Sequence, residues 1–152
     1  MHPEEKIAQL GLSLPPAATP AAVYVPFVQS GNLLFLSGHI PKRNGQVVVG
    51  QLGRTMQTAE AKQVAREVTV DLLGTLKAAV GDLGRIQRIV KVMGLVNSTP
   101  DFTEQHLVIN GCSELLGEVF ADKGVHARSA FGVAQIPLGA CVEIELIAEI
   151  SS

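Results

Sequence analysis

The feature that most constrains the fold is an alternation of apolar and acidic residues near the end of the chain. Two β-rich runs, residues 129–136 and 141–150, flank the turn-forming sequence Pro-Leu-Gly-Ala at 137–140. This pattern predicts a hairpin with a longer loop. Successive side chains of a strand point to opposite faces, so the second run has one apolar and one acidic face. The apolar face carries Val142, Ile144, Leu146, Ala148 and Ile150, and the acidic face carries Glu143, Glu145 and Glu149.

Arg128 precedes the first run, and Glu143 lies early in the second. In a hairpin that turns near residues 138 and 139, the residue opposite Arg128 is near Glu149. Glu143 then lies about six residues farther along, roughly 20 Å from Arg128. The two side chains are therefore not expected to pair within one chain. If both serve one site, that site must lie between subunits.

The composition also favours an oligomer. A chain of 152 residues predicts one domain with a substantial core. Hydrophobic residues make up 47% of the chain and charged residues only 17%, whereas about 25% charged residues is typical. A monomer of this composition would expose an unusually apolar surface. A homo-oligomer that hides part of that surface is the simplest resolution, because obligate interfaces are hydrophobic.

Three features bear on the location of the chain. Lys91 interrupts the apolar run 89–96, so no run reaches the ~18 apolar residues of a membrane span. The first six residues are polar and acidic, unlike a secretory signal. Cys112 and Cys141 form no CxxC motif, which favours reduced structural thiols. The sequence therefore predicts a cytoplasmic protein that does not span a membrane.

Several function classes are disfavoured. The net charge is −2 and the pI is near 6.1, and the only basic cluster spans residues 85–91, so nucleic acid is not an expected partner. The glycine-containing sequences 50–53 and 81–84 match neither a P-loop nor a dinucleotide fingerprint. The histidines show no zinc-type spacing; they are His2, His39, His106 and His126. We therefore expect neither a metal nor another cofactor.

Hydrophobic spacing gives the expected order of elements. A short helix at 3–12 and a proline-rich connector ending at 20 precede a core of residues 21–152. The order is helix, three strands, helix, strand, helix, two strands, which predicts an α+β fold with both long helices on one face of a mixed sheet. The long helices are expected at 58–81 and 100–124, and the first four strands at 24–29, 33–37, 46–49 and 89–96.

One ordered set of residues resembles a known family. The specific part combines Arg128-Ser129, Pro137 and the sequence Val-Glu-Ile-Glu at 142–145. Together with Tyr24, the strand end at 36–41, Asn110 and Ala127, it resembles the reactive intermediate deaminase family, also called RidA/YjgF or L-PSP. The resemblance extends from about residue 23 to residue 150.

The resemblance implies both an architecture and an activity. It implies a chorismate-mutase-like α+β fold, a homotrimer, and three clefts at the subunit interfaces. It also implies hydrolysis of reactive enamines and imines, such as 2-aminoacrylate, to 2-oxo acids and ammonia, without metal or cofactor. Ala130 stands where the best-known members carry a cysteine, and the N-terminal helix suggests a divergent branch, so the substrate preference stays open.

Two residues are assigned catalytic roles. The guanidinium of Arg128 can grip the carboxylate of a 2-imino acid bidentately. Glu143 can deprotonate the water that attacks the C=N carbon and return a proton to the departing amine. Each has a structural alternative: an arginine that starts a strand is often solvated or salt-bridged, and Glu143 could belong to a solvated acidic edge.

The resemblance also implies substrate-binding residues. Side chains of Tyr24 and Asn110 would line the cleft, main-chain groups at Gly38 and Ala130 would fix the ligand, and Ser37 would assist. Asn110 could instead satisfy a local backbone group, and Tyr24 could be a core residue with its hydroxyl at the surface. His39 is interpreted as structural.

Two other functions are weighed against the deaminase. The same cleft could hold a small carboxylate without catalysis, as a sensor or scavenger. An endoribonuclease, the older label of the family, is disfavoured by the acidic pI and by the lack of aromatic residues among the basic ones.

Overall fold

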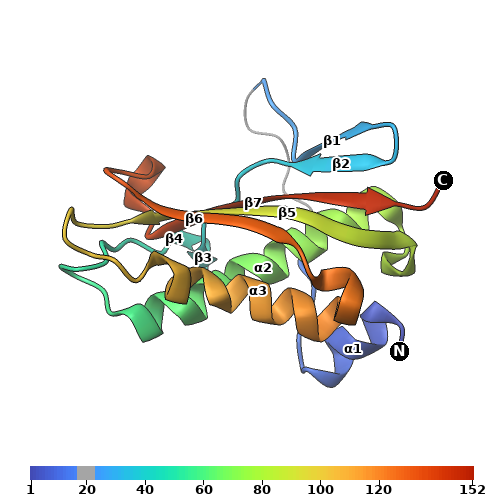
Figure 1. Cartoon of the computed structure of the whole chain (residues 1–152), viewed down its shortest axis with the longest axis horizontal. Helices are drawn as coiled ribbons and strands as arrows, with labels where there is room; N and C mark the ends of the chain where they lie inside the picture. Colours follow the sequence, from blue (N-terminus) through green and yellow to red (C-terminus); the bar gives the residue numbers. More distant parts are fainter. Residues whose placement is uncertain (17–22) are drawn as a thin grey trace.

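The computed structural model describes residues 1–16 and 23–152. Its layers are a five-stranded sheet and two long helices, with a short N-terminal helix beside them (Figure 1). The helices are α1 (Pro3–Gln9), α2 (Thr58–Val80) and α3 (Gln105–Phe120), with 3-10 turns η1 (Leu83–Arg85), η2 (Ala121–Gly124) and η3 (Pro137–Gly139). The strands are β1 (Phe27–Ser30), β2 (Leu33–Leu36), β3 (Lys42–Arg43), β4 (Gln46–Val47), β5 (Ile86–Asn97), β6 (Ala127–Val133) and β7 (Val142–Ile150).

The large sheet is mixed, with strand order β1-β2-β7-β5-β6. Among the described strands of this sheet, β5 and β6 run parallel and the other neighbours run antiparallel. Parallel strands need a crossover connection, and α3 supplies it between β5 and β6. The expected α+β arrangement on a mixed sheet is confirmed.

The expected hairpin between the last two strands is wrong. β5 lies between β6 and β7 and pairs with both. Because α3 crosses over the sheet, β6 becomes a parallel neighbour of β5, and η3 then carries the chain past the end of β5 to its other side. The register of Arg128 changes accordingly: it is level with Val92 on β5 and, through Val92, with Leu146 on β7.

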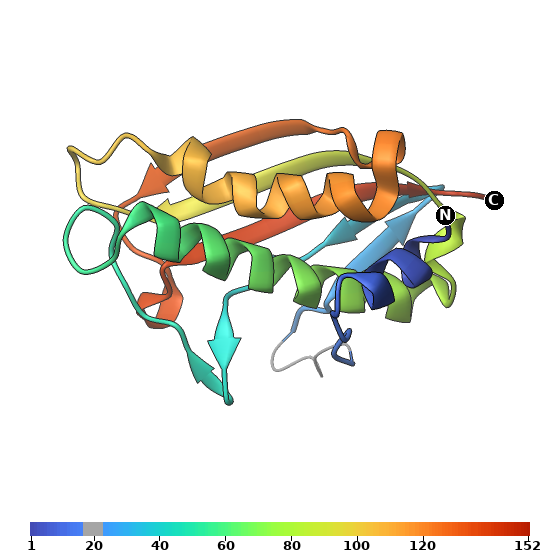
Figure 2. The same ribbon diagram turned by 90° about the horizontal axis from the view of Figure 1, so that it is seen from below.

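Both long helices cover the same face of the sheet (Figure 2). Along α2, Val64, Val68, Leu72 and Leu76 recur every four residues and are fully buried, as expected for one apolar stripe of a helix. The inward face of β7 is Val142, Ile144, Leu146, Ala148 and Ile150, as the alternation predicted. Within residues 1–16 and 23–152, no helix combines the length and apolar character needed to cross a membrane.

The other face of the large sheet carries exposed apolar side chains. Val28 is 55% exposed, Phe35 41% and Phe131 43%, and they lie on β1, β2 and β6. Val28 pairs with Phe35, and Phe131 pairs with Leu95, so these residues share the face turned away from the helices. We call it the open face. Exposed apolar patches of this kind mark interaction surfaces.

A separate two-stranded ribbon replaces one expected strand of the main sheet. β4 was expected as part of the main sheet, but among the described strands it pairs with β3 alone. Asn44 and Gly45 turn the ribbon with φ angles of 52° and 77°, as an Asn-Gly hairpin turn requires. An ion pair from Arg43 to Glu67 at 2.8 Å connects the ribbon to α2.

The N-terminal helix packs on the same core. Ile7 of α1 is buried within it. The helix is shorter than predicted because Gly11, with a φ of 73°, follows its end. The prediction of one domain, with a division at residue 20, stays a prediction because residues 17–22 lie outside the described part of the chain.

Both thiols are free and buried. Burial raises the pKa of Cys112 and of Cys141 to about 11. Their reading as reduced structural residues therefore fits their surroundings, because thiols are reactive only as thiolates.

The two long helices lie close together at Gly111. A Cβ at this position would lie 2.0 Å from the backbone oxygen of Lys62 on α2. Backbone atoms cannot move aside cheaply, so we expect Gly111→Ala to lower the free energy of unfolding by about 3 kcal/mol through overpacking. Urea unfolding measures this change.

Gly117 provides the matched control on the same helix. Apart from the neighbouring backbone of its own helix, a Cβ there would meet no atom of the described residues within 4 Å. Gly117→Ala should therefore raise the free energy of unfolding by up to about 1 kcal/mol, because alanine is the better helix former. Equal effects of the two substitutions would contradict the close approach of α2 and α3.

Candidate functional site

Glu143 lies on the open face of the sheet, against the end of β2. It pairs with Leu95 on β5 and is half-buried. The backbones of His39 and Ile144 form two hydrogen bonds, of 2.9 and 3.0 Å, which place Gly38 beside Glu143. A Cβ on Gly38 would lie 2.7 Å from Oε2 of Glu143. A glycine at this position therefore makes room for the carboxylate.

The surroundings of Glu143 favour its protonated form. Burial raises the pKa of this carboxyl, and the neighbouring charge of Glu145 raises it further. A carboxylate with a raised pKa is a stronger base once ionised, and a general base works best when its pKa is close to the working pH. Glu145 and Glu149 are exposed and fit the solvated acidic edge considered from the sequence, whereas Glu143 is half-buried.

His39 fixes the loop that carries Gly38. Its Nδ1 donates to the carbonyl of Ser37 at 2.7 Å, so Nε2 accepts from the hydroxyl of Thr75 on α2 at 2.8 Å. Both ring nitrogens are thus used within the fold, in agreement with the structural reading of His39. Burial lowers the pKa of His39.

The buried neutral His39 makes a specific prediction for acid stability. An unfolded histidine takes up a proton near pH 6.5, whereas folded His39 resists it. The unfolded state therefore binds more protons as the pH falls, and the free energy of unfolding decreases from about pH 7 to pH 5. The free energy of unfolding of His39→Gln should fall less steeply with falling pH. The variant should therefore be less stable than the wild type at pH 7, and the difference between them should become smaller toward pH 5. Urea unfolding between pH 8 and pH 5 measures the difference.

Thr75→Val serves as the control for that prediction. It removes a hydrogen bond to the ring but retains the buried histidine. Its stability should be lower at every pH, with the slope of the wild type. A constant gap between His39→Gln and the wild type would contradict the prediction.

Ser37 anchors the segment that carries Tyr24. Its hydroxyl donates to the carbonyl of Val25 at 2.6 Å, and its N–H donates to the carbonyl of Pro26 at 2.9 Å. Tyr24 lies just before β1 and is 60% exposed. The alternative reading of Tyr24 as a core residue is therefore wrong. Ser37 holds this segment against the end of β2, two residues from His39.

Arg128 lies on the opposite face of the sheet and contacts α3. Its Nη1 donates to Oδ1 of Asn110 at 2.8 Å and to Oγ of Ser113 at 3.2 Å, and its Nη2 donates to the carbonyl of His106 at 3.4 Å. Across the described residues, no carboxylate pairs with Arg128. Arg128 is therefore held by hydrogen bonds to α3 and not by a salt bridge. Asn110 makes one of these bonds, so its role goes beyond satisfying a local backbone group.

Two residues of this cluster were not predicted from the sequence. Ser113 lies three positions after Asn110 on α3, and its Oγ is 2.9 Å from Nε2 of His126. Nδ1 of His126 lies 2.6 Å from the carbonyl of Gly124. The helical i, i+3 spacing of Asn110 and Ser113 was the available signal, because such residues share one face.

Ala130 lies two residues beyond Arg128 on β6. It is half-buried and packs against the core. β6 is an edge strand, and the outer edge of such a strand presents backbone N–H and C=O groups that no strand pairs with. Main-chain binding near Ala130, as the resemblance implies, is thus compatible with the topology.

Within one chain, the predicted residues form two separate groups. Glu143, Gly38, Ser37 and Tyr24 lie around the end of β2, whereas Arg128 and Asn110 lie between β6 and α3. Arg128 is three residues along and two strands across from Glu143, roughly 10 Å in each direction. Their side chains also point to opposite faces. One chain alone therefore does not bring Arg128 and Glu143 together.

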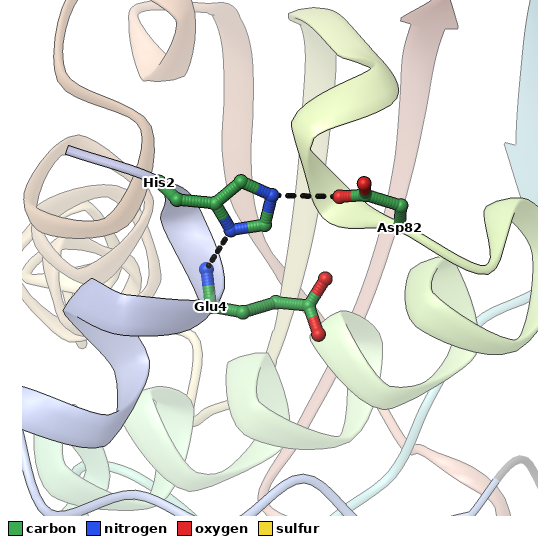
Figure 3. Close-up of side chains that lie close together, drawn as sticks. All are labelled: His2, Glu4 and Asp82. Carbon is green, nitrogen blue, oxygen red and sulfur yellow. Dashed lines mark hydrogen bonds and ion pairs between the residues drawn. The ribbon is translucent and has the colours of Figure 1, made fainter.

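A third cluster of polar side chains lies at the N-terminus. The ligand atoms of His2, Glu4 and Asp82 all lie within 4.8 Å of one another (Figure 3). Nδ1 of His2 accepts from the Glu4 N–H at 3.1 Å, and its Nε2 donates to Asp82 at 2.7 Å. Lys77 and the Leu83 N–H bind the Glu4 carboxylate. These contacts fasten α1 to η1 and already use both nitrogens that could hold a metal.

Comparison with known proteins identifies the family. The model of the family described as "YjgF/chorismate mutase-like, putative endoribonuclease" matches residues 4–150. The chain belongs to the RidA/YjgF family. The chain is 44% identical to Protein TCP17 of Trypanosoma cruzi over 96% of its length and 92% of that protein.

Other RidA/YjgF relatives bear different names. The "Putative regulator AldR" of Lactococcus lactis is 32% identical over 88% of this chain and 93% of the relative. A solved structure from Shewanella oneidensis MR-1, described as "a putative endoribonuclease", superposes with a TM-score of 0.94 and 31% identity, over 99% of this chain and all of that one. The family and its chorismate-mutase-like fold, expected from the sequence, are thus confirmed.

Proposed function

We propose that this RidA/YjgF protein is a cytoplasmic homotrimer that hydrolyses reactive 2-imino and enamine acids, such as 2-aminoacrylate, to 2-oxo acids and ammonia. The reaction takes place in clefts between subunits and uses no metal or cofactor. The observation that carries the proposal is that each chain holds a guanidinium against α3 and a carboxyl with a raised pKa on its open face.

Arg128 is suited to bind the substrate carboxylate. Nη1 has two acceptors on α3, and Nη2 has the carbonyl of His106. Among the described residues, the Nε–H and one Nη2–H have no acceptor, and the Nε–Nη2 side forms one edge of the planar guanidinium. Such an edge matches the two oxygens of a carboxylate. Asn110 contributes by holding the far side of the guanidinium.

Glu143 is suited to act on water. Its ionised carboxylate accepts a proton from a water molecule as the oxygen attacks the carbon of the protonated C=N bond, and the nitrogen becomes a neutral amine. The carboxyl then returns this proton to the nitrogen, which leaves as ammonia while the hydroxyl gives its proton to the carboxylate and the C=O bond of the 2-oxo acid forms. A general base and acid of this kind contributes roughly 10²- to 10⁴-fold to a rate.

A trimer supplies the geometry that one chain lacks. Arg128 and Glu143 point to opposite faces of their own sheet, so a shared site needs residues from two chains. The apolar open face, with Val28, Phe35 and Phe131 exposed, provides a surface for association. Tyr24, Ser37 and Gly38 lie at the same end of β2 as Glu143 and would enter the cleft with it.

The experiment follows ammonia release from 2-imino acids generated in situ by an amino acid oxidase. Purified protein should accelerate the release, and light scattering should give three times the mass of the chain. A dilute, stable monomer would overturn the shared cleft, and ammonia release at the uncatalysed rate would overturn the activity.

The second candidate is a trimer that binds a small carboxylate without turning it over. The name of the Lactococcus lactis relative, a regulator, favours this reading. Thermal stabilisation by 2-oxo acids, without hydrolysis of any imino acid, would support it. An endoribonuclease, which the family description names, is less well supported because the chain is acidic, with a net charge of −2.

A further inference from the structure

A chain of hydrogen bonds extends behind Arg128, away from the proposed carboxylate edge. The carbonyl of Gly124 can only accept, so the proton of the His126 ring lies on Nδ1. In the neutral ring, Nε2 is then an acceptor, and it takes the hydroxyl hydrogen of Ser113 at 2.9 Å. The lone pairs of Ser113 Oγ are left to accept from Nη1 of Arg128 at 3.2 Å.

This chain of bonds removes a choice that Ser113 would otherwise have. The hydroxyl hydrogen of a serine inside a helix commonly turns to the carbonyl four residues earlier. Without His126, the Ser113 hydroxyl would be free to rotate to that carbonyl. His126 fixes the hydroxyl instead, so that an acceptor faces the guanidinium. Asn110 Oδ1, at 2.8 Å, is the second acceptor of Nη1. Nη1 therefore donates to two acceptors whose positions are fixed by α3 and His126.

We infer that Ser113 and His126 are positioning residues for Arg128, which hold its Nη1 so that the Nε–Nη2 edge is available to a substrate carboxylate. The inference rests on the proposed function in taking Arg128 as the carboxylate-binding residue. Neither Ser113 nor His126 needs to touch the substrate. They act through the guanidinium, whose rotation they restrict.

Nitrogen-15 NMR of the ligand-free protein tests the positioning directly. In the wild type, Nη1 and Nη2 of Arg128 should give separate signals, because the bonds from Asn110 and Ser113 hinder rotation. Ser113→Ala removes one hydrogen bond to Nη1, and His126→Phe leaves the Ser113 hydroxyl free to turn its hydrogen elsewhere. Each substitution should speed the exchange of these signals roughly tenfold. Ser113→Thr, which keeps the hydroxyl, should restore slow exchange. Unchanged exchange in Ser113→Ala and His126→Phe would overturn the inference.

Pyruvate, a 2-oxo acid, serves as the probe for carboxylate binding. Ser113→Ala should weaken the affinity for pyruvate roughly tenfold, and Ser113→Thr should bind nearly as the wild type does. Because His126 acts through Ser113, the double variant Ser113→Ala/His126→Phe should bind no more weakly than Ser113→Ala alone. Ser13→Ala, which changes an exposed serine after α1, is the control and should leave the affinity unchanged.

The outcomes separate this inference from the proposed function. Equal pyruvate affinity in the wild type and in Ser113→Ala would overturn the positioning role while Arg128 kept its own. If the wild type does not bind pyruvate, the proposed role of Arg128 fails, and the exchange of its Nη signals still decides whether Ser113 and His126 position it.

Discussion

Arg128→Ala is expected to reduce ammonia release from 2-imino acids at least about a hundredfold, because the substrate then has no anchor for its carboxylate. The effect should appear in kcat/KM, and pyruvate binding should be lost as well. The fold should persist, since Arg128 lies at the edge strand β6 and is only partly buried. Steady-state kinetics and circular dichroism measure the two effects.

Two further substitutions sharpen this result. Arg128→Lys keeps the charge but lacks the planar edge, so it should recover only part of the activity. Arg88→Ala removes an exposed arginine from β5 and should leave the activity unchanged. Undiminished ammonia release by Arg128→Ala would contradict the assignment of Arg128.

Local patterns in the sequence predicted the elements well, because each depends on residues close together in the chain. The alternation at 141–150 identified the buried and exposed faces of β7, and the spacing of apolar residues identified α2 almost to its ends. The mixed sheet with both helices on one face followed from the order of these elements.

Strand pairing was the point at which local patterns failed. A turn sequence between two strands indicates that the chain changes direction, and it does not show whether a third strand enters between them. The 12-residue β5 occupies that place and pairs with both β6 and β7. The conclusion that Arg128 and Glu143 do not meet within one chain survives, but its physical reason is different: they lie on opposite faces.

The candidate site was only partly predictable for a related reason. Arg128, Asn110 and Glu143 stood in motifs with a resemblance to a family, whereas Ser113 and His126 belong to no such motif. Their roles depend on a hydrogen-bond chain between α3 and the segment before β6. Contacts of this kind follow from tertiary packing, which residue spacing alone does not specify.

Glu143→Gln should lower the rate of ammonia release by roughly 10²- to 10⁴-fold, because glutamine cannot take a proton from water. Gln has nearly the same shape and still fits against Gly38, so the affinity for pyruvate should change little. The loss should therefore fall on kcat rather than on binding. A variant with the kcat of the wild type would remove Glu143 from the mechanism.

The same substitution should not lower stability near neutral pH. Folding raises the pKa of Glu143, chiefly through burial, so the folded state keeps this proton to a higher pH than the unfolded state does. The free energy of unfolding therefore decreases as the pH rises from about 4 through the raised pKa. Glu143→Gln lacks this decrease and should gain stability relative to the wild type over that range. Urea unfolding at several pH values measures the gain.

Mixing the two inactive variants tests whether the residues come from different chains. Arg128→Ala subunits supply an intact Glu143, and Glu143→Gln subunits supply an intact Arg128. If each cleft joins Arg128 of one subunit to Glu143 of its neighbour, trimers refolded from an equal mixture should regain about one quarter of the wild-type activity, since half of the subunits carry each residue. If both residues had to come from the same chain, every mixed trimer would stay inactive, and the arrangement of the cleft proposed from the opposite faces of the sheet would be wrong.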